Sequence, residues 1–294
     1  MKLRHSQAVL VMVAVTALWS MAGVVTRQLE SARSFEVTFW RSFFTMVSLL
    51  VILPLWQGTS VFKRMPWRSQ YFWLSGVCWS IMFTAFMVAL TLTAVANVLI
   101  TMALGPLITA LLSWLITGQK LPLRTWCAVG LAGIGIGWMF ASQIDVAATG
   151  FWLGVTVAVA VPIAGAVQWN LVQRSHTQGL ELDLVPSVLI GAVISSFITL
   201  PWSVPFQATT ADIQWLAILG LFQLAIPCVL SVVCAKVLKA AEVSLLALLE
   251  VVFGIALAWF GANERPAGQA LLGGSMVLLA LLLNELLAWR QRNV

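Results

Sequence analysis

Long apolar stretches alternate with short polar gaps along the chain, and most gaps contain Gly, Pro, Asn or charged residues. An α-helix needs about 20 mostly apolar residues to cross the hydrocarbon core of a bilayer. The stretches have this length, so the pattern predicts about ten membrane-spanning helices. The predicted helices cover residues 6–26, 36–56, 69–90, 94–117, 123–142, 149–172, 183–203, 211–236, 242–262 and 267–289.

The gap at 91–93 decides how the rest of the chain is threaded. If this gap separates two helices, residues 69–90 and 94–117 form a tight helical hairpin. If one broken helix runs through it instead, every later segment changes sides of the membrane. The basic residues that would then lie outside are Lys120, Arg124, Arg174, Lys236 and Lys239.

The distribution of basic residues distinguishes these two threadings. With a hairpin at 91–93 and a cytoplasmic N-terminus, 12 of the 16 Lys and Arg residues lie on the inner side. They are Lys2, Arg4, Lys63, Arg64, Arg68, Lys120, Arg124, Arg174, Lys236, Lys239, Arg290 and Arg292, against Arg27, Arg33, Arg41 and Arg265 outside. Because Lys and Arg in short loops resist translocation, we predict a multi-pass inner (plasma) membrane protein with both termini cytoplasmic.

The composition excludes several classes of function. Only 9% of the residues are charged and 61% are hydrophobic, whereas a soluble domain has about 25% charged residues. The net charge of +6 is dispersed over loops, which indicates contact with membrane lipid and not with nucleic acid. The sequence has no metal-ligand spacing, no nucleotide-binding glycine loop and no nucleophile motif, so we expect no cofactor and no enzymatic activity.

The chain contains a weak internal repeat. Residues 94–121 align with 239–266 at an offset of 145, which pairs Leu104 with Leu249 and Trp114 with Trp259. The repeat units are then 1–145 and 146–294, each with five predicted helices. Because the number of helices per unit is odd, the second copy enters the membrane from the opposite face. The predicted fold is all-α, with ten transmembrane helices in two inverted five-helix repeats.

Several short segments resemble the EamA-type members of the drug/metabolite transporter superfamily. The segment at 248–266 resembles the second-repeat signature, with Glu250 at the acidic position, Trp259 at the aromatic position and Glu264 as the terminal acid. Residues 17–20 resemble the opening aliphatic-Trp motif, and residues 40–43 resemble the following Arg-Phe pair. The resemblance extends over the whole chain in size, number of spans and loop length.

This resemblance implies a secondary carrier that exports small metabolites, such as amino acids or related amphipathic compounds, by alternating access. Two positions differ from the family pattern. Val251 stands where a Pro is usual, and Gly105 carries no acid at the first-repeat position. The alternatives are a membrane scaffold subunit without transport activity or an intramembrane enzyme.

Two charged residues fall inside the apolar stretches, where a charge is costly unless it is paired or hydrated. For Glu250 we consider two roles: a group that binds a substrate amine or a coupling proton, and a structural carboxylate bonded to a neighbouring helix. Arg41 lies near the outer end of its predicted helix. It is predicted either to reach the membrane surface with its long stem, or to pair with a substrate carboxylate or with an acid at a helix end.

Uncharged polar and aromatic residues form a second group of candidates. The polar members are Asn97, Thr101, Gln168, Asn170 and Gln223. They are expected either to hold helices together or to line a cavity. The aromatic members are Trp19, Trp79, Phe83 and Trp169. They either pack against apolar neighbours or form a pocket suited to cations and flat rings.

Overall fold

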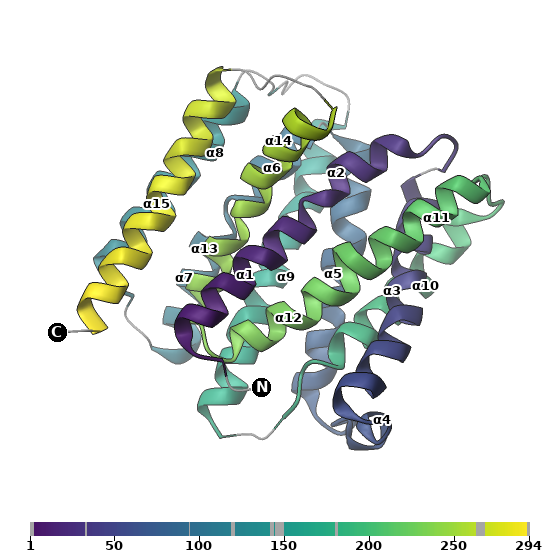
Figure 1. Cartoon of the computed structure of the whole chain (residues 1–294), viewed down its shortest axis with the longest axis horizontal. Helices are drawn as coiled ribbons and strands as arrows, with labels where there is room; N and C mark the ends of the chain where they lie inside the picture. The colour runs from purple at the N-terminus through teal and green to yellow at the C-terminus, as the bar shows by residue number, and fades with distance from the viewer. Residues whose placement is uncertain are drawn as a thin grey trace.

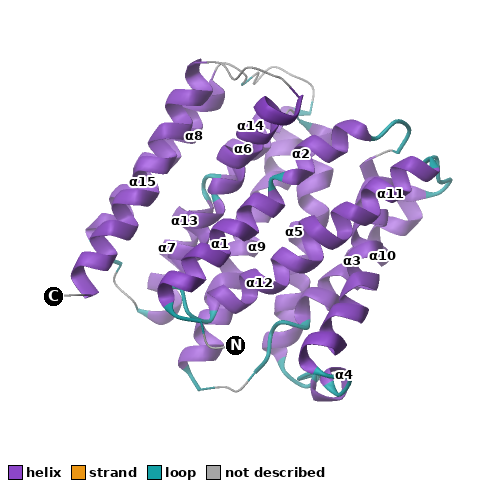
Figure 2. Cartoon of the chain, in the orientation of Figure 1, coloured by secondary structure: helices purple, strands orange, loops and turns teal. Residues whose placement is uncertain are grey.

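In the computed structural model of the chain, the described residues form helices joined by loops and turns (Figure 2). These residues are 3–32, 34–93, 95–118, 121–141, 144, 150–179, 182–262 and 268–292. No strand occurs in these ranges.

Each apolar stretch of the sequence forms one or more helices in the structure. The longer helices of the first part are α1 (His5–Trp19), α3 (Ser34–Gln57), α5 (Gln70–Leu92), α7 (Gly105–Thr117) and α8 (Leu123–Phe140). Those of the second part are α9 (Phe151–Thr177), α10 (Ser187–Ser203), α12 (Ile226–Ala235), α14 (Leu249–Ala262) and α15 (Gly268–Arg292). The remaining elements are α2 (Met21–Val25), η1 (Thr26–Gln28), α4 (Val61–Arg64), α6 (Val95–Met102), α11 (Thr210–Ile218), η3 (Leu219–Ala225) and α13 (Ala240–Ala247).

Four of the predicted helices are interrupted, which the apolar pattern did not indicate. The first is broken at Ser20, between α1 and α2, and the eighth contains the π-helical segment η3. The fourth is broken at 103–104, between α6 and α7, and the ninth is broken at Leu248, between α13 and α14. The last two breaks are related by the same offset of 145 residues that aligns the two segments in the sequence.

The helices run alternately up and down in a single bundle (Figure 1). α6 and α7 descend in this view while α13 and α14 ascend, so the two broken helices run in opposite directions. α8 and α15 pack side by side, as do α7 and α13. The N- and C-termini lie at the same, lower end of the bundle.

The length and hydropathy of the helices agree with a membrane location. Among the described residues, seven helical segments are long and apolar enough to cross a bilayer, and three further apolar helices are shorter. The outer surface is rich in exposed apolar side chains, such as Leu115 and Leu282, as a surface in contact with lipid requires. The count of ten transmembrane helices stays a prediction.

Two buried carboxylates hold together the end of the bundle that is opposite the termini. Glu36 accepts hydrogen bonds from the backbone N–H groups of Gln207 and Ala208 at 2.8–3.0 Å. Asp212 accepts from the N–H groups of Glu30, Ser31 and Ala32 at 2.8–3.1 Å. These bonds join the start of α3 to the segment before α11, and the start of α11 to the segment before α3.

Polar contacts also join helices at the end that carries the termini. Asp183 pairs with Lys236 at 3.0 Å and accepts a hydrogen bond from Gln57 at 2.7 Å. His5, at the start of α1, lies 3.1 Å from the carboxylate of Glu242 in α13. The middle of the bundle, between these two polar ends, contains the cavity described next.

Candidate functional site

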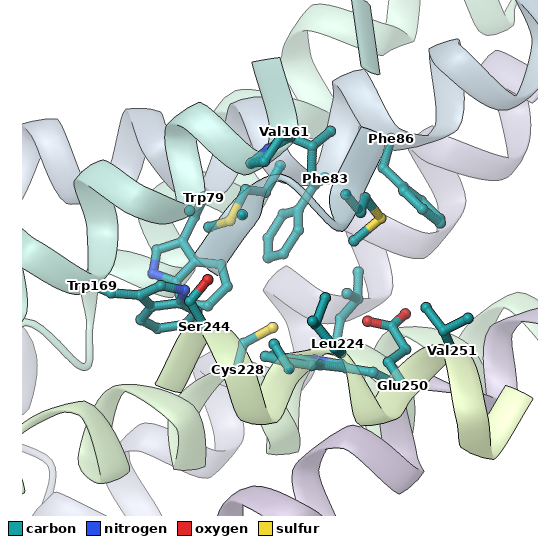
Figure 3. Close-up of a pocket in the computed structure, with 18 of the residues that line it drawn as sticks. Trp79, Phe83, Phe86, Val161, Trp169, Leu224, Cys228, Ser244, Glu250 and Val251 are labelled. Carbon is teal, nitrogen blue, oxygen red and sulfur yellow. The ribbon is translucent and has the colours of Figure 1, made fainter. Parts of the chain in front are cut away.

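A cavity of about 140 Å³ lies in the middle of the bundle. Its wall is mostly apolar and aromatic, with a few polar side chains (Figure 3). The residues that line it are Trp19, Arg41, Trp79, Met82, Phe83, Phe86, Leu99, Met102, Gly105, Val161, Pro162, Gly165, Ala166, Trp169, Gln223, Leu224, Cys228, Ser244, Ala247, Leu248, Glu250 and Val251.

The lining comes from both parts of the chain. The first part contributes Trp19 at the end of α1, Arg41 in α3 and the aromatic residues of α5. The second part contributes Trp169 in α9 and the residues around the α13–α14 break. Four helix interruptions border the cavity, at the end of α1, at the end of α6, in η3 and at Leu248.

Glu250 is directed into this cavity (Figure 3). It lies in the first turn of α14, because the break at Leu248 starts a new helix there. The positive end of a helix dipole stabilises a carboxylate at this position, which lowers the cost of an acid at membrane depth. Within the described residues, its carboxylate accepts no hydrogen bond, so its oxygens can bind a ligand group, and its charge interacts with that of Arg41.

Arg41 is nearly enclosed by protein, with only 2% of its surface exposed. Its Nη2 donates a hydrogen bond of 3.2 Å to the backbone carbonyl of Phe83, and its Nε has no partner in the described part of the chain. Its guanidinium is close enough to Glu250 for the two charges to attract each other. Arg41 therefore supplies a positive charge that balances the acid of the same cavity.

Aromatic rings form one side of the cavity. The indole of Trp79 meets that of Trp169 edge to face, with ring centroids 5.8 Å apart and an interplanar angle of 83°. Trp79 also packs on Phe83 at 5.7 Å. Rings in this arrangement present electron-rich faces that attract organic cations.

Gln223 reaches the cavity from the π-helical segment η3. This segment is pressed against α3: a Cβ atom on Gly220 would lie 2.9 Å from the carbonyl oxygen of Arg41. Thr45 joins the two elements, because its hydroxyl is 2.8 Å from Arg41 O and 3.1 Å from Gly220 O. π-Helical turns often occur at functional sites, since the extra residue redirects side chains.

Of the sequence-predicted site residues, seven line the cavity: Trp19, Arg41, Trp79, Phe83, Trp169, Gln223 and Glu250. The other four do not line it. Asn97 bonds to Thr93 at 2.8 Å, and Thr101 bonds to the carbonyl of Asn97 at 2.7 Å.

The two remaining polar residues join α9 to its neighbours. Gln168 accepts a hydrogen bond of 2.7 Å from Ser75 in α5, and Asn170 accepts one of 2.6 Å from Ser113 in α7. The bonds of Gln168 and Asn170 thus join helices, whereas the bond of Thr101 lies within α6.

The other fifteen lining residues were not among the predicted site residues; three of them are Gly105, Cys228 and Ser244. A signal existed for the first of them, since the offset of 145 residues pairs Gly105 with Glu250. Glu264 and the side chain of Trp259 lie outside the described residues.

The polar groups of the cavity include one carboxylate and one guanidinium, together with the Cys228 thiol and the Ser244 hydroxyl. No cluster of three or more His, Cys, Asp or Glu residues that could hold a metal ion occurs in the described ranges.

A family model described as the EamA-like transporter family matches the chain twice, over residues 6–141 and 152–286. The chain belongs to the EamA-like transporter family. It is therefore a multi-pass membrane transporter of the drug/metabolite transporter superfamily, built from two EamA repeats.

Comparison with solved structures gave a match over the whole EamA-like chain. One structure, described only as a crystal structure of a protein, has a TM-score of 0.81 and 18% sequence identity, and covers 98% of this chain and 99% of that chain. At this identity the match establishes a shared fold. The comparison with curated protein sequences gave no match.

Proposed function

We propose that this protein is a secondary transporter that exports small amphipathic metabolites with an amine group, such as amino acids, across the bacterial inner membrane. The observation that carries this proposal is the Glu250 carboxylate, which projects into an aromatic cavity lined by both repeats and accepts no hydrogen bond from the described residues. A carboxylate without hydrogen bonds in a low-dielectric site is costly, and a bound ammonium group or proton reduces that cost.

The charges of the lining support a substrate of low net charge. Glu250 and Arg41 cancel each other, so a zwitterion leaves the net charge of the cavity at zero, and an ammonium group that replaces a proton on Glu250 leaves that charge unchanged. The rings of Trp19, Trp79 and Trp169 add cation–π attraction for an ammonium group and apolar contact for a side chain. In this proposal the proton is the coupling ion, and Glu250 carries it when no substrate is bound.

The repeat architecture supports alternating access. In the proposed topology, ten transmembrane helices form two inverted repeats, 1–145 and 146–294. The opposite directions of α6–α7 and α13–α14 agree with inversion, as do their breaks at equivalent positions. Inverted repeats around a central site allow one half to move against the other and expose the site to each side in turn.

Transport by the purified protein in liposomes tests the proposal. Labelled amino acids and amines are offered to liposomes that contain the wild-type protein, Glu250→Gln or the control Glu30→Gln, whose acid is exposed and outside the cavity. We expect uptake or release of at least one amine-bearing compound with the wild type and the control, and a large loss with Glu250→Gln. Absence of transport for every compound, or full activity of Glu250→Gln, would contradict the proposed function.

A further inference from the structure

The N-termini of α7 and α14 border the cavity, and they carry different residues at equivalent positions. Glu250 lies in the first turn of α14 and supplies a carboxylate at that end. The equivalent position in α7, at the offset of 145 residues, is Gly105, which has no side chain. No side-chain hydrogen bond caps the start of α7. One end therefore presents an acid to the cavity. The other presents the backbone N–H groups of Gly105 and Leu107, because Pro106 has no N–H and the N–H of Leu104 donates to the carbonyl of Thr101 at 3.1 Å.

Ser244 points at this uncovered end of α7. It is only 6% exposed, and a Cβ atom on Gly105 would lie 3.3 Å from its Oγ. Its hydroxyl forms no hydrogen bond within the described part of the protein, whereas the buried hydroxyl of Thr109 donates to the carbonyl of Gly105 at 2.7 Å. A buried hydroxyl without a partner costs free energy, so a ligand that bonds to it gains affinity.

These two observations point to a binding site for a negative group. The first N–H groups of a helix lack partners within the helix and carry partial positive charge, so they bind carboxylates and phosphates. We infer that the N-terminus of α7 and the Ser244 hydroxyl form a carboxylate-binding subsite. This inference rests on the proposed function: the substrate is a zwitterion whose ammonium group pairs with Glu250 and whose carboxylate lies at Gly105 and Ser244.

Arg41 is the competing partner for a substrate carboxylate. Its Nη2 donates to the carbonyl of Phe83, and its Nε has no partner in the described part of the chain, so the experiment must distinguish Arg41 from Ser244 as the carboxylate partner. Ser244 and Glu250 are six residues apart, which corresponds to about 9 Å along a helix. Figure 3 shows Ser244 on the side of Trp79 and Trp169, and Glu250 on the side of Phe86 and Val251. The two ends of a zwitterion thus have separate partners.

Matched pairs of substrates test the subsite. Liposomes containing wild type, Ser244→Ala or the control Ser196→Ala are offered labelled L-amino acids, each paired with the amine that lacks its carboxyl group. Ser196 is equally buried but bonds to the carbonyl of Ala192 at 2.8 Å and lies outside the cavity. We expect Ser244→Ala to raise KM about tenfold for the amino acid and to leave KM within about twofold for the amine.

The amines also show whether Ser244→Ala is folded, because they do not use the subsite. An equal rise of KM for both members of a pair, or no rise for the amino acid, would overturn the subsite. Transport of amines without any amino acid would overturn it as well, while leaving the transport function intact. If neither class is transported by the wild type, the proposed function itself fails.

Discussion

Trp79 in α5 and Trp169 in α9 meet edge to face at the cavity, although 90 positions separate them in the sequence. Each ring is at least 95% buried. The contact joins the third predicted span to the sixth, and so connects the first repeat to the second. The pair therefore contributes both to the wall of the site and to the packing of the bundle.

Replacing Trp169 by Ala should weaken this connection. Loss of a buried aromatic side chain costs about 3–5 kcal/mol, because the transfer free energy is lost and a cavity remains. The matched control is Trp138→Ala in α8, since Trp138 is 53% exposed. Thermal unfolding of the purified proteins in detergent should show a large drop in Tm for Trp169→Ala and a small one for the control. Equal shifts would contradict the packing role.

Glu250→Gln should separate a functional carboxylate from a structural one. Gln keeps the size and hydrogen-bonding capacity of Glu but cannot ionise, so we expect transport to fall about 10- to 100-fold while Tm changes little. Any dependence of the rate on pH that comes from Glu250 should also disappear. The measurement is transport against pH in liposomes for wild type, Glu250→Gln and Glu250→Ala.

A structural carboxylate would give the opposite pattern for the same variants. Gln would then preserve transport, and Ala would lower Tm by leaving partner groups unpaired. A Glu250→Gln variant with the wild-type rate and pH profile would end the functional interpretation.

Gly220→Ala should disturb the contact between η3 and α3. The added Cβ atom would lie 2.6 Å from the Cβ of Phe44 and 2.9 Å from both Arg41 O and Thr45 N, so the helices must separate. We expect a destabilisation of about 1–3 kcal/mol, typical of overpacking, and reduced transport because Arg41 and Gln223 move. The control is Gly130→Ala, where a Cβ atom meets nothing within 4 Å. This control should stabilise α8 by up to about 1 kcal/mol.

The predicted orientation can be tested by cysteine labelling in intact cells. In a protein lacking Cys78, Cys127, Cys228 and Cys234, a new cysteine is placed at Gln207 or at Lys239. Both positions are exposed, and they lie at opposite ends of the bundle. A membrane-impermeant maleimide should label position 207 directly and position 239 only after permeabilisation. Labelling of position 239 in intact cells would contradict cytoplasmic termini.

The sequence by itself determined where the helices are and that the chain belongs in a membrane. Apolar length is a local property of the chain, so the stretches could be located without knowledge of their neighbours. Gly, Pro and charged residues marked the gaps between the helices, and they are also a local signal. The offset that pairs Leu104 with Leu249 also relates the two helix breaks to each other, although the apolar pattern predicted neither break.

Only the tertiary structure decided which side chains reach the cavity. In a bilayer, lipid and protein interior are both apolar, so hydrophobic periodicity does not mark the inner face of a helix. Gln168 and Gln223 are alike in the sequence, yet one bonds to Ser75 and the other lines the cavity. Ser244 acquires its role because α7 and α13 pack together at Gly105. Such contacts depend on helices that are distant in the chain, and no local pattern encodes them.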